Sequence, residues 1–427
     1  MKFPWLALIA GAVLAPSISS IPAHAADVTG AAVVKHYGDV AEAMYSDALA
    51  AALDLQKAVD AFIAAPTDDT LAAARQAWLA SRPWYQQTEG FRFGNAIVDD
   101  WEGRVNAWPL DEGLIDYVDS KSYGDSSDEN PLYAANVIGS KEIRIGNDVV
   151  DVSKLDASVL SSLQEAGEVE ANVAIGYHAV EFLLWGQDLN GTGPGAGNRP
   201  ASDYDVNNCT NGNCDRRAAY LKAATDLLVA DLQEMVGNWA ADGAARKDLD
   251  AKGEEGGLAT ILTGLGSLSY GELAGERMKL GLILHDPEEE HDCFSDNTHN
   301  SHYYDEAGMA AIYSGTYNRR DGSVLDGPGI ADYAAAKTPE KAAALDALFA
   351  DALAKMKAVK DRADSGTEAY DQMIGEGNAE GNALVQAAID GLVAQTHGIE
   401  AVVSDLKLTI TVEGSDSLDN PSAVTTE

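Results

Sequence analysis

Apolar residues recur at helical spacing over most of the chain. From residue 28 to residue 65 they return every three or four positions, which predicts one long amphipathic helix or two in succession. Pro66 is expected to end this helical region, and the polar residues 67–69 to cap a second helix predicted over Thr70–Ser81. Further helices are predicted over residues 216–249, 338–360 and 378–403. The pattern predicts an all-α protein.

Few stretches depart from this periodicity. Residues 141–152 alternate apolar and polar side chains and could form a short strand, and residues 406–412 a terminal strand or an extended tail. Residues 285–306 are rich in Asn, Asp and Ser and contain Pro287, which favours a loop. We therefore expect long irregular loops and at most minor β structure.

The helical runs fall into two groups on either side of a segment rich in Gly, Pro and Asn. We expect two helical-bundle-like domains packed together, 26–200 and 216–427, joined by a linker at 201–215. Cys209 and Cys214 enclose an Asn-Gly turn, and in an oxidising compartment such a pair favours a disulfide that pins the linker. The third cysteine, Cys293, is expected to be a buried thiol.

The N-terminus has the organisation of a secretory signal peptide over residues 1–25. Lys2 gives a short positive start, residues 6–14 form a short apolar run, and Ala23-His24-Ala25 is a small-x-small cleavage site. No later segment reaches the 18 or so uninterrupted apolar residues of a membrane span. We expect an exported protein without a transmembrane segment.

The formal net charge of −39 narrows the range of partners. Such a charge repels nucleic acid and anionic membranes and concentrates cations near the surface. It excludes DNA or RNA as a favoured partner. It does not by itself indicate a metal site, because an acidic surface also keeps proteins soluble in salty water.

The strongest candidate for chemistry is a His–Glu pair within residues 166–188, a stretch that we interpret as one buried helix. His178 and Glu181 stand three residues apart in the pattern Gly176-x-His-x-x-Glu, so they share one helix face. Burying such a pair among apolar side chains costs several kcal/mol unless a metal, a proton partner or a ligand compensates it. The alternative is a structural His–Glu pair that satisfies itself.

A His/carboxylate donor set suits iron or zinc better than copper(I). Two ligands are too few, and further ones would come from Glu89, Asp111 or the stretch at residues 285–302, although we expect His291 and His302 to lie at the surface. The His-Glu-x-x-His zinc helix and the Gly-x-Ser-x-Gly elbow are both absent from the sequence.

Several blocks of the sequence resemble one protein family. Residues 176–186, GYHAVEFLLWG, are similar to the signature of the imelysin-like proteins, most closely the branch called iron-regulated protein A. Four further blocks match that branch: Trp108–Asp111, Gly271–Met278, Glu290–His299 and Glu413–Asp419. The resemblance runs in order over nearly all of the chain after the signal peptide.

The resemblance implies an exported protein of the periplasm, or of the periplasmic side of the outer membrane, that takes part in iron acquisition. It implies a site between two helical domains that binds iron (alternatively zinc), haem or an iron chelate, with an envelope iron-uptake component as a further partner. The expected metal ligands are His178, Glu181 and Glu89, followed by Asp111 and His299. The residues expected to line the site are Gly176, Trp108, Glu272, Glu276, Arg277, Ser295, Asp296 and Asn297.

Other interpretations stay open. Some relatives are classed as metallopeptidases. If this chain is one, Glu89 or Glu272 would serve as the base, so the sequence leaves enzymatic activity undecided. The chain could also be an envelope binding module without a metal. Glu272, Glu276 and Arg277 could simply pair with one another. Asp296, Asn297 and His299 could cap a helix and hold the loop.

Overall fold

The computed structural model describes residues 28–424, so the predicted signal peptide lies outside the described residues. The long helices are α1 (Gly30–Ala64), α2 (Asp68–Gln86), α6 (Gly176–Trp185), α7 (Cys214–Trp239), α8 (Ala244–Ala251), α9 (Gly253–Ser267), η4 (Leu268–Leu280, π-helical), α11 (Thr298–Ser314), α12 (Ile330–Lys337), α13 (Pro339–Asp364) and α15 (Ala379–Leu406). The short helices are α3 (Ala96–Glu102), α4 (Glu112–Ile115), α5 (Ala157–Leu163), α10 (Gly281–Leu284), α14 (Tyr370–Ile374) and α16 (Asp416–Asp419), with 3-10 turns η1 (Glu89–Phe91), η2 (Ala166–Glu168), η3 (Ala201–Asp203) and η5 (Pro287–Glu289).

The prediction of an all-α protein with minor β structure is confirmed. The strands of the described residues form two antiparallel hairpins, β1 (Glu142–Ile145) with β2 (Asp148–Asp151) and β3 (Thr316–Asn318) with β4 (Val324–Asp326). The first hairpin falls in the stretch where alternation predicted a strand. Residues 407–412 form no strand and run as an extended tail.

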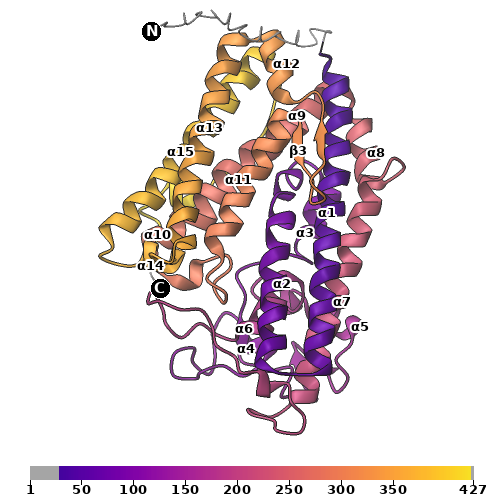
Figure 1. Cartoon of the computed structure of the whole chain (residues 1–427), viewed down its shortest axis with the longest axis vertical. Helices are drawn as coiled ribbons and strands as arrows, with labels where there is room; N and C mark the ends of the chain where they lie inside the picture. The colour runs from indigo at the N-terminus through magenta and orange to yellow at the C-terminus, as the bar shows by residue number, and fades with distance from the viewer. Residues whose placement is uncertain (1–27, 425–427) are drawn as a thin grey trace, which may run out of the picture.

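Two groups of helices lie side by side (Figure 1). In one group α1 packs against α2 and α7, and in the other α13 packs against α11 and α15. The groups meet where α2 contacts α11 and where α1 contacts α9. α7 follows the predicted linker yet packs against α1, and the division into two domains stays a prediction. A disulfide joins Cys209 to Cys214 just before and at the start of α7.

The N-terminal helices begin at side-chain caps. The Thr29 hydroxyl accepts a hydrogen bond from the Ala32 amide, and α1 then continues as one helix over the whole region where one or two were expected. Thr67 and Thr70 form a reciprocal capping box at the start of α2. α2 continues past Pro83, beyond the predicted end, because the packing of buried side chains in its last turn outweighs one lost hydrogen bond. No helix of the described residues is both long and apolar enough to cross a membrane.

α9, η4 and α10 form one continuous helical run with a π-helical centre that lies against the C-terminal tail. At Gly271 a Cβ would lie 2.7 Å from the carbonyl oxygen of Glu413, so glycine permits the tail to approach the helix. The Ser417 hydroxyl donates to the Gly275 carbonyl nearby. The sequence blocks at residues 271–278 and 413–419 are therefore neighbours in space.

Three predictions of the sequence are wrong in detail. Residues 166–188 are not one helix, because the segment before Gly176 is irregular. The expected loop at residues 285–306 ends at residue 297 and α11 begins at Thr298, because the buried contacts of this helix outweigh its polar local composition. Cys293 is half-buried rather than buried.

Candidate metal centre

The start of α6 depends on Gly176, the first residue of the helix. Its φ is +85°, and a Cβ would lie 2.6 Å from the carbonyl oxygen of Val105. The same carbonyl accepts a hydrogen bond of 2.8 Å from the amide of Tyr177. Because only glycine tolerates both the positive φ and this close approach, Gly176 fixes where α6 begins and where His178 points.

The other end of α6 is held by neighbouring polar groups. Gly186, at φ +72°, ends the helix. The Leu183 carbonyl accepts from the hydroxyl of Tyr204, and the Leu184 carbonyl accepts from the guanidinium of Arg75. Every residue of α6 is buried, so the carbonyls that lack a partner within the helix obtain one here.

His178 and Glu181 contact each other, as their spacing predicts. The Nδ1 atom of His178 lies 3.0 Å from Oε2 of Glu181. The other carboxylate oxygen accepts from the amide of Ser295 at 3.0 Å and from its hydroxyl at 2.7 Å. When Nδ1 donates its proton to Glu181, the lone pair of the Nε2 atom is left available, and that buried atom has no hydrogen-bond partner.

Two further residues complete a group that could hold a metal ion. His178, His291 and Asp292 each offer one ligand atom, and these atoms all lie within 4.8 Å of one another. All three side chains are buried. Among the described residues this is the one group of three or more His, Cys, Asp or Glu side chains that satisfies that distance.

Arg82 of α2 balances the charge of Asp292. Its Nη2 atom lies 2.8 Å from Oδ1 of Asp292, and both side chains are fully buried. The other oxygen of Asp292 accepts from the side-chain amide of Asn297 at 2.7 Å and from the hydroxyl of Ser301. Asp292 is therefore held in place by three donors from α2, α11 and the loop before α11.

The same surroundings keep the imidazoles neutral and the carboxylate charged. Burial, followed by the charge of Arg82, lowers the pKa of His178 to about 3, and burial also places the pKa of His291 well below its usual value. Burial alone would raise the pKa of Asp292, but Arg82 and the hydrogen bonds lower it to about 2. Neutral imidazole and ionised carboxylate are the protonation states that bind metals.

The donor set fits a transition metal. Two imidazoles and one carboxylate are the ligands of many iron(II) sites and of hydrolytic zinc sites. The unpartnered Nε2 atom of His178 is the observation that supports this fit, because a buried nitrogen without a partner costs free energy.

Glu89, an expected ligand, lies outside this group. Its Oε2 atom is 2.7 Å from Nη2 of Arg277 in a fully buried ion pair. Arg277 also donates from Nε to Glu272 at 2.9 Å and from Nη1 to Asp305 at 3.2 Å. We call these four residues the Arg277 cluster.

The other expected ligands lie elsewhere. Asp111 accepts from the side-chain amide of Asn130. His299, on α11, has its Nε2 atom 3.3 Å from Asp364. Neither belongs to the group formed by His178, His291 and Asp292.

Several residues expected to line the site border one cavity of about 640 Å³, which reaches His291. Its lining includes Trp108, Glu272, Glu276 and Arg277. Ser295 and Asn297 contact Glu181 and Asp292, as described above. Asp296 has a positive φ of 55° and belongs to a different cluster, considered below.

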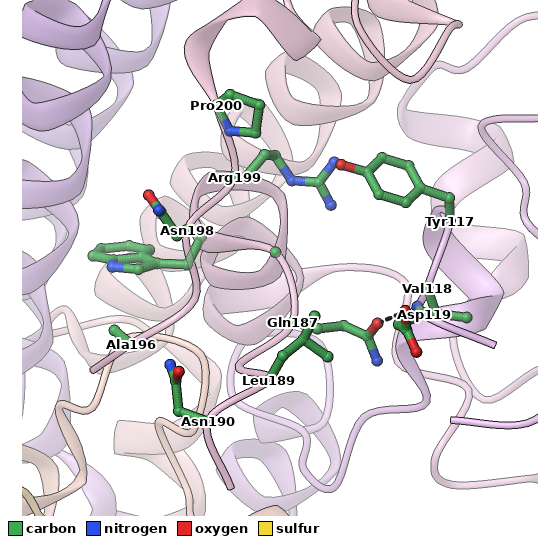
Figure 2. Close-up of a pocket in the computed structure, with 12 residues that line it drawn as sticks. Tyr117, Val118, Asp119, Gln187, Leu189, Asn190, Ala196, Asn198, Arg199 and Pro200 are labelled. Carbon is green, nitrogen blue, oxygen red and sulfur yellow. Dashed lines mark hydrogen bonds between the residues drawn. The ribbon is translucent and has the colours of Figure 1, made fainter. Parts of the chain in front are cut away.

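A second cavity, of about 380 Å³, lies beyond the end of α6. Figure 2 shows Arg199 pointing toward Tyr117, and the Gln187 side chain bonded to the backbone of Asp119. The charge of Arg199 is already balanced by Asp116, 2.7 Å away. This cavity contains none of the three candidate ligands, so it is not the metal centre.

His291, Asp292 and Arg82 were not among the predicted site residues. His291 and His302, predicted at the surface, are 1% and 0% exposed. The local sequence Glu-Glu-Glu-His-Asp suggests a solvated loop. In the structure the rings of Trp108, His178 and His302 pack around His291. Two signals were available: both residues lie within a block that resembles the family, and within the stretch at residues 285–302 that was named as a source of further ligands.

Comparison with known proteins agrees with this architecture. The model of the Imelysin family (Peptidase_M75) matches residues 41–399. Iron-regulated protein A of Synechococcus elongatus is 41% identical over 71 residues, which is 16% of this chain and 20% of that protein. A crystal structure from Parabacteroides distasonis, provisionally named an iron-regulated protein A precursor, has a TM-score of 0.61 at 16% identity, covering 89% of this chain and 97% of the other. It shows a shared fold, and the family match establishes that this chain belongs to the imelysin family.

Proposed function

We propose that this protein is an exported iron-binding protein in which His178, His291 and Asp292 hold the metal. Two observations carry the proposal: the Nε2 atom of His178 is buried without a partner, and ligand atoms of His178, His291 and Asp292 lie within 4.8 Å of one another. Iron is favoured over other metals that accept these donors because the relatives carry iron-regulated names. Export rests on the signal peptide expected at residues 1–25 and on the word precursor in one of those names.

The neighbouring residues have supporting roles in this proposal. Glu181 orients the imidazole of His178 through Nδ1, as carboxylates commonly do for metal-bound histidines. Arg82 holds Asp292 and offsets the charge of its carboxylate. Glu89 is committed to Arg277, so it contributes to the fold rather than to the ligand set.

The cavity beside His291 favours a cationic ligand. Its ionisable lining is mostly acidic: Asp99, Asp100, Glu102, Glu165, Glu170, Glu272 and Glu276, with Arg92 and Arg277 as the basic members. Both arginines already form ion pairs with carboxylates, Arg92 with Asp99 at 2.8 Å and Arg277 with Glu89 at 2.7 Å. Such a lining attracts metal cations and repels anionic ligands such as haem propionates or citrate chelates. We therefore favour the iron ion itself over a chelate.

Titration of the purified protein with iron(II) under anaerobic conditions tests the proposal. His178→Ala and His291→Ala are each expected to weaken binding by at least roughly 100-fold, since each removes a ligand. Asp111→Asn is the matched control and should bind as the wild type does. Equal affinity of the wild type and both histidine variants would refute the proposal.

A metallopeptidase is the second candidate, favoured by the family model's name and by a donor set shared with hydrolytic zinc sites. It would require chelator-sensitive cleavage of an unstructured protein that is lost in His291→Ala. The burial of His178 and Asp292 argues against it, because a peptide substrate must reach the metal and only His291 of the three candidate ligands borders the cavity of about 640 Å³.

A further inference from the structure

A second group of acidic side chains lies near the metal centre and contains no histidine. Asp188 follows α6, Glu290 and Asp296 lie in the segment between η5 and α11, and Asp371 lies in α14. We call these four residues the carboxylate cluster. Asp188, Glu290 and Asp371 line one small cavity, and Asp296 lies six residues after Glu290 in the same segment.

Five oxygen atoms of Glu290, Asp371 and Asp296 are buried without partners, whereas Asp188 accepts from Asn190. Glu290 and Asp371 are 1% and 2% exposed, and neither oxygen of either carboxylate has a hydrogen-bond partner. The Oδ1 atom of Asp296 is also buried and unpartnered. No member of the cluster forms an ion pair with any residue in the described part of the chain. Burying carboxylates in this way costs several kcal/mol unless a proton or a cation compensates them.

The cluster borders a small cavity of about 10 Å³, lined by Asp188, Glu288, Glu290 and Asp371 together with Gly191, Pro287, Cys293 and Phe294. That volume is close to the size of one water molecule or one ion. Burial and the neighbouring carboxylates raise the pKa of Asp371 and of Asp296 to about 7 each, so near neutral pH a cation competes with only weakly held protons.

We propose that the carboxylate cluster binds a single hard divalent cation, namely Ca²⁺. Oxygen donors without nitrogen or thiolate suit Ca²⁺ and Mg²⁺. Ca²⁺ fits better because it accepts six to eight oxygen ligands in irregular geometry, whereas Mg²⁺ demands a near-ideal octahedron and retains its waters. The three side chains already offer five buried, unpartnered oxygens: Oε1 and Oε2 of Glu290, Oδ1 and Oδ2 of Asp371, and Oδ1 of Asp296.

The ligand atoms of the carboxylate cluster lie farther apart than those of the metal centre. No three of its carboxylates bring ligand atoms within 4.8 Å of one another, as His178, His291 and Asp292 do. Mutual repulsion holds such side chains apart, and a cation would draw them together by rotation of the side chains. Bound Ca²⁺ would join the end of α6 and α14 to the segment that carries His291 and Asp292. It would thus stabilise the loop that supplies two of the three proposed iron ligands.

Thermal unfolding and calorimetric titration of the iron-free protein with CaCl₂, at constant ionic strength and pH 7.5, test the proposal. At 100 times the Kd, Ca²⁺ should raise the unfolding midpoint by about 3 °C. Asp371→Asn and Glu290→Gln should each weaken Ca²⁺ binding at least roughly tenfold. Asp371→Asn, measured without Ca²⁺, should unfold at a temperature equal to or above that of the wild type, because it removes a repelling charge. Asp125→Asn, in an exposed loop, is the control for a lost surface charge.

The outcome separates the calcium site from the iron site. His178→Ala should keep its full response to Ca²⁺ even if it has lost iron. No response of the wild type to Ca²⁺, or an undiminished response of Asp371→Asn, would overturn the proposal. It would also be overturned if Asp371→Asn lost iron(II) binding while the wild type did not bind Ca²⁺.

Discussion

The Arg277 cluster and the metal centre are both buried and both charged, yet they differ in one respect. All three guanidinium nitrogens of Arg277 have a carboxylate partner, namely Glu272, Asp305 and Glu89. In the metal centre the Nε2 atom of His178 has none. Burial and charge therefore do not distinguish a candidate site from a structural network in this protein. An unpartnered atom does, when further ligand atoms lie close to its residue, as they do for His178.

The difference has a physical basis. A buried ion pair whose hydrogen bonds are complete is compensated and has little capacity for another ligand. A buried imidazole with one satisfied nitrogen and one unsatisfied nitrogen is held in position but still has a lone pair to offer. The first arrangement stabilises the contact between η1, η4 and α11, and the second is suited to binding.

The largest change in stability is expected when the ion pairs of the Arg277 cluster are removed. Arg277→Ala leaves Glu89 and Asp305 without a cationic partner and Glu272 with Arg92 alone, and the free energy of unfolding should fall by about 3–5 kcal/mol. Urea unfolding of the iron-free protein measures this change. Arg92→Ala, at a quarter-exposed position beside the same cavity, should cost much less. If both variants lost equal stability, the Arg277 cluster would not be the structural network inferred here.

A smaller effect, on iron affinity, is expected when the hydrogen bond between Glu181 and His178 is weakened. Glu181→Gln keeps the shape of the side chain but weakens its hold on Nδ1 of His178. Iron affinity should fall roughly 10- to 100-fold, as it does when the orienting partner of a metal ligand is lost. The free energy of unfolding should change much less than in Arg277→Ala, because the amide keeps the shape of the carboxylate and an oxygen that still accepts a hydrogen bond. An iron affinity unchanged from wild type would mean that Glu181 does not position the ligand.

Glu306 has a buried oxygen without a partner, as His178 has a buried nitrogen, but it belongs to no group of candidate metal ligands. We therefore expect it to hold a proton rather than a metal. Burial raises the pKa of Glu306 to about 8, although Gln395 donates to its other oxygen. Between pH 4.5 and 8 the folded protein keeps this proton while the unfolded chain has released it. Stability is therefore lost as the pH rises through that interval, with a slope of about 1.4 kcal/mol per pH unit.

The Glu306→Gln variant should lack the pH dependence of stability that comes from Glu306. Unfolding free energies of the wild type and the variant, measured from pH 4.5 to pH 8, should diverge in favour of the variant as the pH rises. Parallel curves would show that Glu306 is ionised in the folded protein.

The sequence predicted the helices well and the site only in part. The helices over residues 30–64 and 379–406 were recognisable because their apolar residues follow the helical period through the whole element. His178 and Glu181 were recognisable because both lie on one short helix. Their contact depends on local spacing alone.

What could not be predicted depends on partners that are distant in sequence. Glu89 looked like a metal ligand until Arg277, 188 residues later, was seen to pair with it. His291 looked solvated because the residues next to it are acidic, whereas Arg82, 209 residues earlier, approaches it in the folded protein. Periodicity contains no information about such pairings.

The most direct test of the central claim is a crystal structure of the iron-loaded protein with anomalous diffraction measured at the iron absorption edge. We predict one strong anomalous peak bounded by Nε2 of His178, the imidazole of His291 and the carboxylate of Asp292, with Glu181 still bonded to Nδ1. An anomalous peak beside Glu89 or Asp111, or none near His178, would contradict it.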